Sequence, residues 1–402
     1  MVHWYFTLVF LVVAPIGQYL TQSYRYSPAT EYLLATNILI IFWCLCYIVG
    51  RFLVKNAGST PLDFSLFVTG VNREQRIVLS VVSLIASVSL VLIYGPSAFL
   101  TRHLRSVAVE QAFGDWGPIS FFLLRCIRPF SLLCVMVVYT KFAKVNDGRA
   151  AFYHSPVLLL AFFVNNPIST PRYYALNIIF GICLLVLIKY LSTGWAPFSI
   201  LMVALPGAQI VDAFRYAESF SDVVRSVALS PFSYILSQTF DAHENISHTI
   251  HYTDEVGFEM GSQLIGGLSF FIPRTVWPNK PVGSGIFISN WLGTQGHTVL
   301  NTNIGVPFLA ESYLNFGILG ILGMGILTGA GIQIFDRRLD ISIGRHVDNS
   351  DSVDLWLQLG VFSTGNLLLF FRGSFLSATS YLSLFVLAWI SMVMLVEIVR
   401  WR

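Results

Sequence analysis

Long apolar stretches recur along almost the whole chain, and they constrain its fold more than any other feature. Residues 37–50, NILIIFWCLCYIVG, and residues 77–94, IVLSVVSLIASVSLVLIY, contain no charged side chain. A helix needs about 20 mostly apolar residues to cross the hydrocarbon core of a bilayer. Only 11% of all residues are charged, whereas soluble domains have about 25%. We therefore expect an all-α polytopic membrane protein.

The apolar stretches predict about ten transmembrane helices. We place them at residues 4–20, 32–54, 77–98, 119–140, 152–168, 175–191, 197–214, 304–334, 353–371 and 380–399. The fifth stretch ends in NNPISTPRYY, which favours a broken or re-entrant helix. The N-terminal residues MVHWYFTLVFLVV lack the basic segment of a secretory signal, so we expect an uncleaved first helix.

Lysine and arginine gather in alternate loops, and this bias predicts the orientation of the chain. The richer set comprises Arg51, Lys55, Arg73, Arg76, Lys141, Lys144, Arg149, Lys189, Arg337, Arg338, Arg345, Arg400 and Arg402. We expect these loops and both termini to be cytoplasmic. We expect one integral membrane domain, 1–402, in which residues 1–214 form seven helices, 215–303 a large outer loop and 304–402 three helices.

The remaining composition argues against several classes of protein. The net charge of +3 is too small and too scattered to suggest nucleic-acid binding. The five cysteines all lie in apolar runs, so we interpret them as small core residues. Because no cysteine and histidine cluster has zinc spacing, we expect no metal and no cofactor.

The segment FFIPRTVWPNKP, residues 270–281, interrupts the apolar pattern inside the predicted outer loop. Its three prolines remove backbone donors, so it cannot be a lipid-facing helix. Arg274 and Lys280 add two positive charges. A stiff, aromatic, cationic loop beside a bilayer suits a phosphorylated lipid substrate.

Other charges also lie in or beside apolar stretches. Arg125 and Arg128 in FFLLRCIRPF either mark a functional site or extend towards the headgroups. Asp212 and Arg215 form either an interfacial ion pair or an arginine directed at a phosphate. Arg372 in FFRGSF is either a juxtamembrane anchor or part of an outer group of cations. This group also includes Arg125, Arg128, Arg172, Arg215, Arg274 and Lys280. Such a group could hold a pyrophosphate.

The segment FDAHENISHTIHY, residues 240–252, concentrates titratable side chains. At helical spacing, Asp241, Glu244, His248 and His251 share one face, and His243 lies nearby. This face could bind a metal, carry acid–base chemistry or form a surface that faces solvent or lipid headgroups, and the sequence leaves all three open.

Glu311 lies at the expected outer entrance of the eighth helix, where it is either interfacial or faces a cavity. Small residues follow it and allow close helix packing. They are glycines 317, 320, 323, 325, 329 and 331.

Several of these motifs resemble one family. The strings FFIPRTVWPNKPVGSG and NTNIGVPFLAESYLNFGILG, with DAFRYAE, TFDAHENISHTIHY and FFRGSF, are similar to those of the Wzy-type O-antigen polymerases, which join oligosaccharide repeat units in bacterial envelopes. The motifs lie within about residues 200–375. One departure is Ser374, where we expect an acidic residue in relatives.

The resemblance implies a GT-C-like glycosyltransferase architecture in the bacterial inner membrane. It implies metal-independent, inverting transfer of a growing glycan from undecaprenyl pyrophosphate to a lipid-linked repeat unit. Arg274 and Lys280 would bind the pyrophosphate, supported by Arg215 and Arg372, and the base would be Asp241, Glu311, His243 or His248. Besides these lipid-linked oligosaccharides and membrane lipids, it implies a chain-length regulator and a flippase as partners.

Two other functions remain open at this point. A ligase that moves finished glycan to another acceptor would use the same chemistry. A transporter or flippase of lipid-linked sugars would need charges along a central path and usually an internal repeat, and we find no such repeat.

Overall fold

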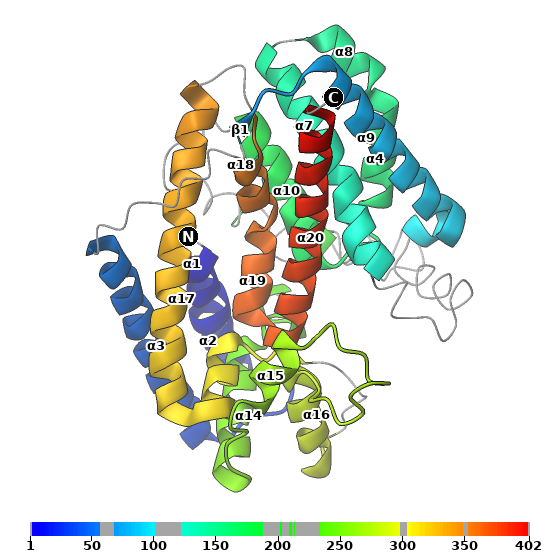
Figure 1. The fold of residues 1–402 in the computed structure, drawn as a ribbon. Coiled ribbons are helices and arrows are strands. Elements are labelled where there is room, and N and C mark those ends of the chain that lie inside the picture. The colour runs from blue at the N-terminus through cyan, green and yellow to red at the C-terminus, as the bar shows by residue number, and fades with distance from the viewer. Residues whose placement is uncertain are drawn as a thin grey trace. The chain divides into compact units, whose positions relative to one another are not determined.

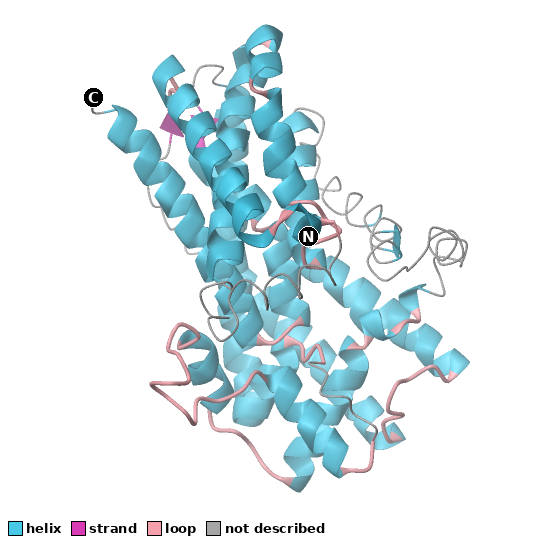
Figure 2. Ribbon diagram, turned by 90° about the vertical axis from the view of Figure 1, so that its right-hand side faces the viewer, coloured by secondary structure: helices cyan, strands magenta, loops and turns pink. Residues whose placement is uncertain are grey.

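The computed structural model describes most of the chain and is almost entirely helical (Figures 1 and 2). The described residues are 2–56, 68–100, 122–145, 147–187, 202, 209–210, 213, 234–297, 304–348 and 353–400. The predicted seventh span, 197–214, and the residues Asp212 and Arg215 lie outside this part, apart from isolated positions. The described chain divides into two compact units, each built from segments far apart in the sequence.

The first unit comprises Met1–Pro61, Leu229–Arg337 and Asn366–Ser380. Its elements are α1 (Val2–Phe6), the π-helix η1 (Thr7–Val13), α2 (Ala14–Thr21), α3 (Thr30–Asn56), the 3-10 helix η6 (Gln238–Phe240), α14 (Ala242–Glu255), α15 (Ser262–Leu268) and α16 (Ser284–Thr294). Three helices contribute residues to both units. They are α17 (Phe308–Asp348), α19 (Thr364–Arg372) and α20 (Phe375–Arg400).

The second unit comprises Leu62–Ala228, Arg338–Gly365 and Tyr381–Arg402. Its elements are β1 (Val68–Thr69), α4 (Arg73–Tyr94), η3 (Pro96–Phe99), η5 (Leu123–Ile127), α7 (Arg128–Val145), α8 (Gly148–Tyr153), α9 (Ser155–Val164), α10 (Arg172–Leu187), β2 (Val353–Asp354) and α18 (Leu355–Phe362). The strands β1 and β2 pair antiparallel and are the one sheet in the described residues. The core lies around α7, whose residues from Leu132 to Val138 are all buried.

Five helical segments of the described chain are long and apolar enough to cross a membrane. They are Val2–Thr21, Thr30–Asn56, Arg73–Tyr94, Phe308–Arg345 and Phe375–Arg400, which correspond to five of the ten predicted spans. The chain is therefore an α-helical, membrane-embedded protein.

The other described spans are shorter or broken. The predicted 152–168 span contains only the ten-residue apolar helix α9, which ends before the Asn165–Pro171 turn. The predicted 353–371 span is divided at Ser363 into α18 and α19. The predicted spans 119–140 and 175–191 correspond to η5 with α7 and to α10.

Helices α3 and α17 run side by side in the first unit, and glycines bring their backbones together (Figure 1). A Cβ atom at Gly50 would lie 2.0 Å from the Ile326 carbonyl oxygen, and one at Gly329 would lie 2.1 Å from the Tyr47 carbonyl oxygen. The glycine-rich stretch thus permits close packing at Gly329, as the sequence predicted. At the end of the contact, the Arg51 guanidinium pairs with Asp336 at 2.8 Å.

This contact gives a direct test of the helix packing. We expect Gly329→Ala to cost about 1–3 kcal/mol, because the added methyl group meets backbone atoms that cannot rotate away. Gly323→Ala is the matched control, since its Cβ would meet nothing within 4 Å. Thermal unfolding in detergent micelles gives the unfolding midpoint of each variant. Equal midpoints for the two would show that α3 and α17 do not pack this closely.

Helix α17 changes direction near its start. Phe316 and Gly317 have non-helical backbone angles. Gly317 has a φ of 59°, a value that residues other than glycine rarely adopt. The break separates a first segment that holds Glu311 and Tyr313 from the longer apolar segment that follows. The helix axis therefore changes direction between the two segments, and this change helps to shape the surroundings of Glu311.

Candidate functional site

The turn between α19 and α20 in the first unit brings together three of the predicted site residues. Arg372, the last residue of α19, donates from Nη2 to Asp241 Oδ1 at 3.2 Å and from Nε to the Thr239 carbonyl at 3.0 Å. Three residues later, the Phe375 N–H donates to Glu311 Oε2 at 2.6 Å. We call Arg372–Phe375 the RG turn. It connects the two predicted carboxylates, Asp241 and Glu311, to one short segment.

Asp241 directly precedes α14 and is buried, with 7% of its side chain exposed. Burial raises the pKa of its carboxyl group, while the charge of Arg372 and a hydrogen bond with Asn245 oppose that rise. A buried carboxylate that keeps one strong cationic partner suits either acid–base chemistry or the positioning of that cation.

Glu311 lies in the first turn of α17 and is fully buried. One of its oxygens accepts the Phe375 N–H. The Ser284 hydroxyl interacts with this carboxylate, and neither the other oxygen, Oε1, nor that hydroxyl forms a further hydrogen bond within the described residues. Buried polar atoms are nearly always hydrogen-bonded in proteins, so this pair is a natural position for a polar group of a substrate.

Small residues surround the RG turn and let other segments approach it. A Cβ at Gly305 would lie 3.3 Å from Arg372 Nη1, and one at Gly283 would lie 3.3 Å from Ser374 Oγ. The Asn245 amide donates to the Gly305 carbonyl at 3.1 Å, which ties α14 to the same place. Ser374, where we expected an acidic residue in relatives, bonds to the Ser377 hydroxyl at 3.0 Å in the first turn of α20. Its side chain therefore helps to begin this helix.

The titratable face of α14 does not form one cluster. Glu244 accepts the backbone N–H groups of Arg25 and Tyr26, at 3.1 and 2.6 Å, and so fixes the connection between α2 and α3. His248 Nε2 lies 3.6 Å from Glu244 Oε1, and both side chains are buried. His251 is partly exposed and pairs with Glu255 at 3.2 Å. A solvated surface is thus wrong for Glu244 and His248, which lie inside the fold.

His243 faces α3 rather than the RG turn. Its Nε2 atom lies 3.0 Å from Asn37 Oδ1. Burial lowers its pKa to about 4, with the Glu244 carboxylate opposing that shift. The imidazole is therefore neutral near pH 7, and it is a weaker base than an exposed histidine.

The buried His243 predicts a loss of stability in acid. Its folded-state pKa, about 4, lies below its ordinary value of 6.5. Its contribution is therefore complete above pH 6.5 and is lost as the pH falls towards 4, up to roughly 3 kcal/mol. We expect His243→Gln to flatten the fall of the thermal midpoint over this interval, and His251→Gln to leave it unchanged. A His243→Gln variant with an unaltered pH profile would contradict the assignment.

The cationic loop is held together by its own two cations. The buried Lys280 ammonium donates to the carbonyl oxygens of Phe270 and Ile272, at 2.9 and 3.1 Å. The exposed Arg274 donates from Nη1 to the Lys280 carbonyl at 2.7 Å. Burial, and then the charge of Arg274, lower the pKa of Lys280. Both side chains thus fix the shape of the loop, a role that their spacing in the sequence did not reveal.

Two other predicted cations, Arg125 and Arg128, have partners of their own within the second unit. Arg125 and Arg128 belong to the second unit, where the Arg125 guanidinium lies 3.4 Å from the centre of the Tyr381 ring. Arg128 is buried and donates to the Ser169 hydroxyl at 3.1 Å. Arg215 lies outside the described residues.

Sequence reasoning missed Ser284 and Asn245. Ser284 follows PVG at the start of α16, and nothing in that string indicates a carboxylate neighbour. Asn245 lies in a formal glycosylation sequon, NIS, although its buried amide bonds to Gly305. Its position four residues after Asp241, on the same helix face, was the available signal.

Comparison with protein-family models, with characterised proteins and with solved structures found no match to this chain.

Proposed function

We propose that this protein polymerises lipid-linked oligosaccharide repeat units, such as those of an O-antigen, a capsule or an exopolysaccharide. The growing glycan moves from undecaprenyl pyrophosphate to a sugar hydroxyl of a new lipid-linked repeat unit. The hydroxyl oxygen bonds to the anomeric carbon, the bond to the pyrophosphate oxygen breaks, and a base takes the hydroxyl proton. The proposal includes about ten transmembrane helices in a GT-C-like arrangement, cytoplasmic termini and a reaction at the outer face of the bacterial inner membrane.

One observation carries this proposal: the RG turn joins Arg372, Asp241 and Glu311. These residues are distant in the sequence, and the family resemblance implies a role in glycosyl transfer for each of them. This arrangement places the Arg372 guanidinium, which can bind a departing pyrophosphate, beside two buried carboxylates. Inverting transfer without a metal needs this pairing of a base and an anion-binding group.

Glu311 is the stronger candidate for the base. Apart from the neutral Ser284 hydroxyl, its Oε1 atom has no partner in the described chain, whereas Asp241 is engaged by the charged Arg372 guanidinium. A buried carboxylate without a cationic partner can accept a proton from a bound hydroxyl. Asp241 then orients Arg372, whose guanidinium remains 28% exposed and can donate to phosphate oxygens in parallel.

Arg274 and Lys280 support the pyrophosphate site in a second way. Because their donors bond to carbonyl oxygens of the loop, they hold residues 270–281 in one shape while keeping two positive charges there. We assign to this loop the electrostatic attraction of the lipid-linked pyrophosphate.

Reconstitution of the purified protein tests the proposal. In vesicles without an ion gradient, we expect it to extend lipid-linked repeat units into a ladder of chain lengths. Transfer of lipid-linked sugar across the bilayer without extension would instead indicate a flippase. Transfer of finished polymer to a different acceptor, with no extension, would indicate a ligase. A normal ladder from a folded Arg274→Ala, Lys280→Ala double variant would remove the loop from the pyrophosphate site.

A further inference from the structure

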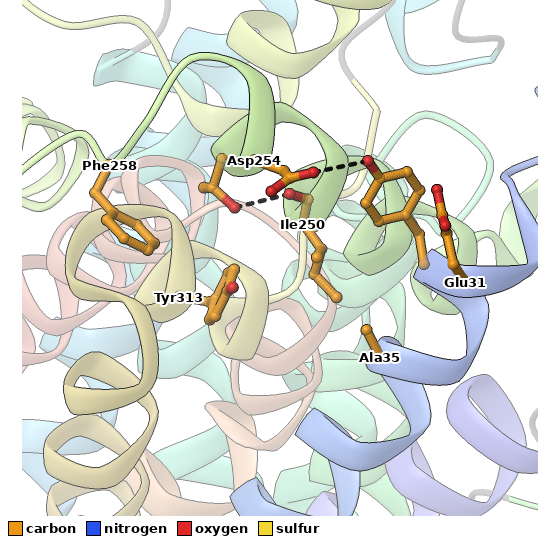
Figure 3. A pocket seen from close by; sticks show the side chains of 8 residues that line it. Glu31, Ala35, Ile250, Asp254, Phe258 and Tyr313 are labelled. Carbon is orange, nitrogen blue, oxygen red and sulfur yellow. Dashed lines mark hydrogen bonds between the residues drawn. The ribbon is translucent and has the colours of Figure 1, made fainter.

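A concave site lies in the first unit, apart from the RG turn, at the ends of three helices (Figure 3). It has a volume of about 480 Å³ and is bordered by the first turns of α3, the end of α14 and the start of α17. Pockets of this size commonly hold small ligands. Two of these helices, α3 and α17, are membrane-spanning by length and composition, and both begin here. The pocket therefore lies at a membrane boundary rather than inside the hydrocarbon.

Aromatic rings form two walls of this pocket. Tyr32 stacks on His251 with ring centres 4.5 Å apart. Phe258 meets Tyr313 edge-on, with centres 5.7 Å apart, and 44% of Phe258 is exposed. In Figure 3 the rings of Phe258 and Tyr313 lie on the opposite side of the opening from Glu31.

The break in α17 holds the Phe258 wall in place. A Cβ at Gly317 would lie 3.0 Å from the Phe258 ring, so the ring rests on the bare backbone of that glycine. The Glu259 N–H also donates to the Leu314 carbonyl at 2.9 Å. The aromatic wall is therefore built into the fold before any ligand arrives, and rigid aromatic surfaces bind at a low entropic cost.

Two carboxylates complete the pocket. Asp254 Oδ2 accepts from the Tyr32 hydroxyl at 3.0 Å, which fixes both side chains, while Glu31 lies exposed beside them. None of the described side chains that line the pocket is cationic. An anionic ligand would meet the negative charges of Glu31 and Asp254 here, whereas hydroxyl and ammonium groups would find strong acceptors.

We propose that this pocket binds a neutral or amino-bearing sugar ring and rejects acidic sugars. Sugar rings present apolar C–H faces to aromatic walls and hydroxyl groups to carboxylates. Tyr313 lies two residues after Glu311, and residues at that spacing face different sides of a helix. The pocket therefore takes a sugar remote from the reacting bond, a role in chain extension that rests on the proposed function.

Binding of free sugars to the full-length protein tests this inference. The probes are the methyl glycosides of glucose, glucosamine and glucuronic acid, measured by saturation-transfer NMR in nanodiscs. We expect the first two to bind and the glucuronide to bind at least about tenfold more weakly. Equal binding of the glucuronide, or tighter binding of a trilysine peptide, would overturn the inference.

Isosteric variants separate charge from folding. In Glu31→Gln combined with Asp254→Asn, the Tyr32 hydroxyl keeps an acceptor, so we expect an intact fold and loss of discrimination against the glucuronide. Tyr313→Phe should retain glucoside binding, and Tyr313→Ala should lose it by about tenfold. Unchanged discrimination or unchanged binding would contradict the assignment. Sugar binding needs no donor lipid, so it can be measured separately from chain extension. Discriminating sugar binding without polymer extension would refute the proposed function but support the assignment of the pocket.

Discussion

Replacing Glu311 with glutamine should reduce chain extension by about 10²–10⁴-fold, the usual contribution of a general base. Glutamine keeps an oxygen that can accept the Phe375 N–H, now 2.6 Å from Glu311 Oε2. The helix start and the RG turn should therefore remain intact. What glutamine lacks is the ability to take the proton from the attacking hydroxyl.

Three further variants make this result specific. Glu311→Ala should also destabilise the protein by about 1–3 kcal/mol, because it leaves the Phe375 N–H without its acceptor. Glu311→Asp keeps the charge but withdraws it by one methylene group, so it tests position. Glu397→Gln, at a partly exposed glutamate paired with Arg400, is the control that should extend chains normally.

The measurement is the rate of chain extension by purified protein on lipid-linked repeat units, with thermal unfolding recorded for each variant. A Glu311→Gln variant that extends chains at the native rate would exclude Glu311 as the base. Asp241 would then be the next residue to test.

The sequence predicted the helical membrane fold because hydrocarbon imposes one simple requirement on a spanning segment. That requirement can be recognised over about 20 residues without knowledge of any partner. The apolar pattern was less informative about helix boundaries where polar residues interrupt the apolar run. At Ser363, the hydroxyl donates to the Leu359 and Gly360 carbonyls, and the predicted span becomes two helices.

The candidate site was predicted residue by residue but not as an arrangement. Charge and motif were enough to select Asp241, Glu311 and Arg372. They could not show that Arg372 contacts Asp241 across 131 positions, because such pairing depends on the fold. Lys280 illustrates the opposite case: its charge suggested a ligand, yet its ammonium bonds to two carbonyls of its own loop.

Removing Arg372 should destabilise the protein by about 3–5 kcal/mol, because it leaves the Asp241 carboxylate buried without its cation. Asp241→Asn should cost less, since the half-buried Arg372 still donates to the Thr239 carbonyl. The Arg372→Met, Asp241→Asn double variant should lose less unfolding free energy than the two single variants lose in total, and the difference should be about 0.5–3 kcal/mol.

A second ion pair in the same unit supplies the matched control. Arg51 pairs with Asp336 at 2.8 Å, and its exposed fraction, 27%, resembles the 28% of Arg372. The acidic partners differ, since Asp336 is 33% exposed and Asp241 only 7%. Arg51→Met should therefore leave a better solvated carboxylate and cost less than Arg372→Met, and equal costs would show that burial of Asp241 is not the cause.

The pH dependence of the Arg372→Met penalty identifies the stranded charge. Burial already raises the pKa of Asp241, and loss of the opposing guanidinium raises it further. A carboxyl group whose folded-state pKa is raised contributes stability below its unfolded pKa, and this stability is lost as the pH rises through the folded pKa. The Arg372→Met penalty should thus be large at pH 8 and shrink in acid, where Asp241 is protonated. In the Asp241→Asn background that dependence should vanish, and a penalty equal at both pH values would show that Arg372 stabilises the turn by packing rather than by charge.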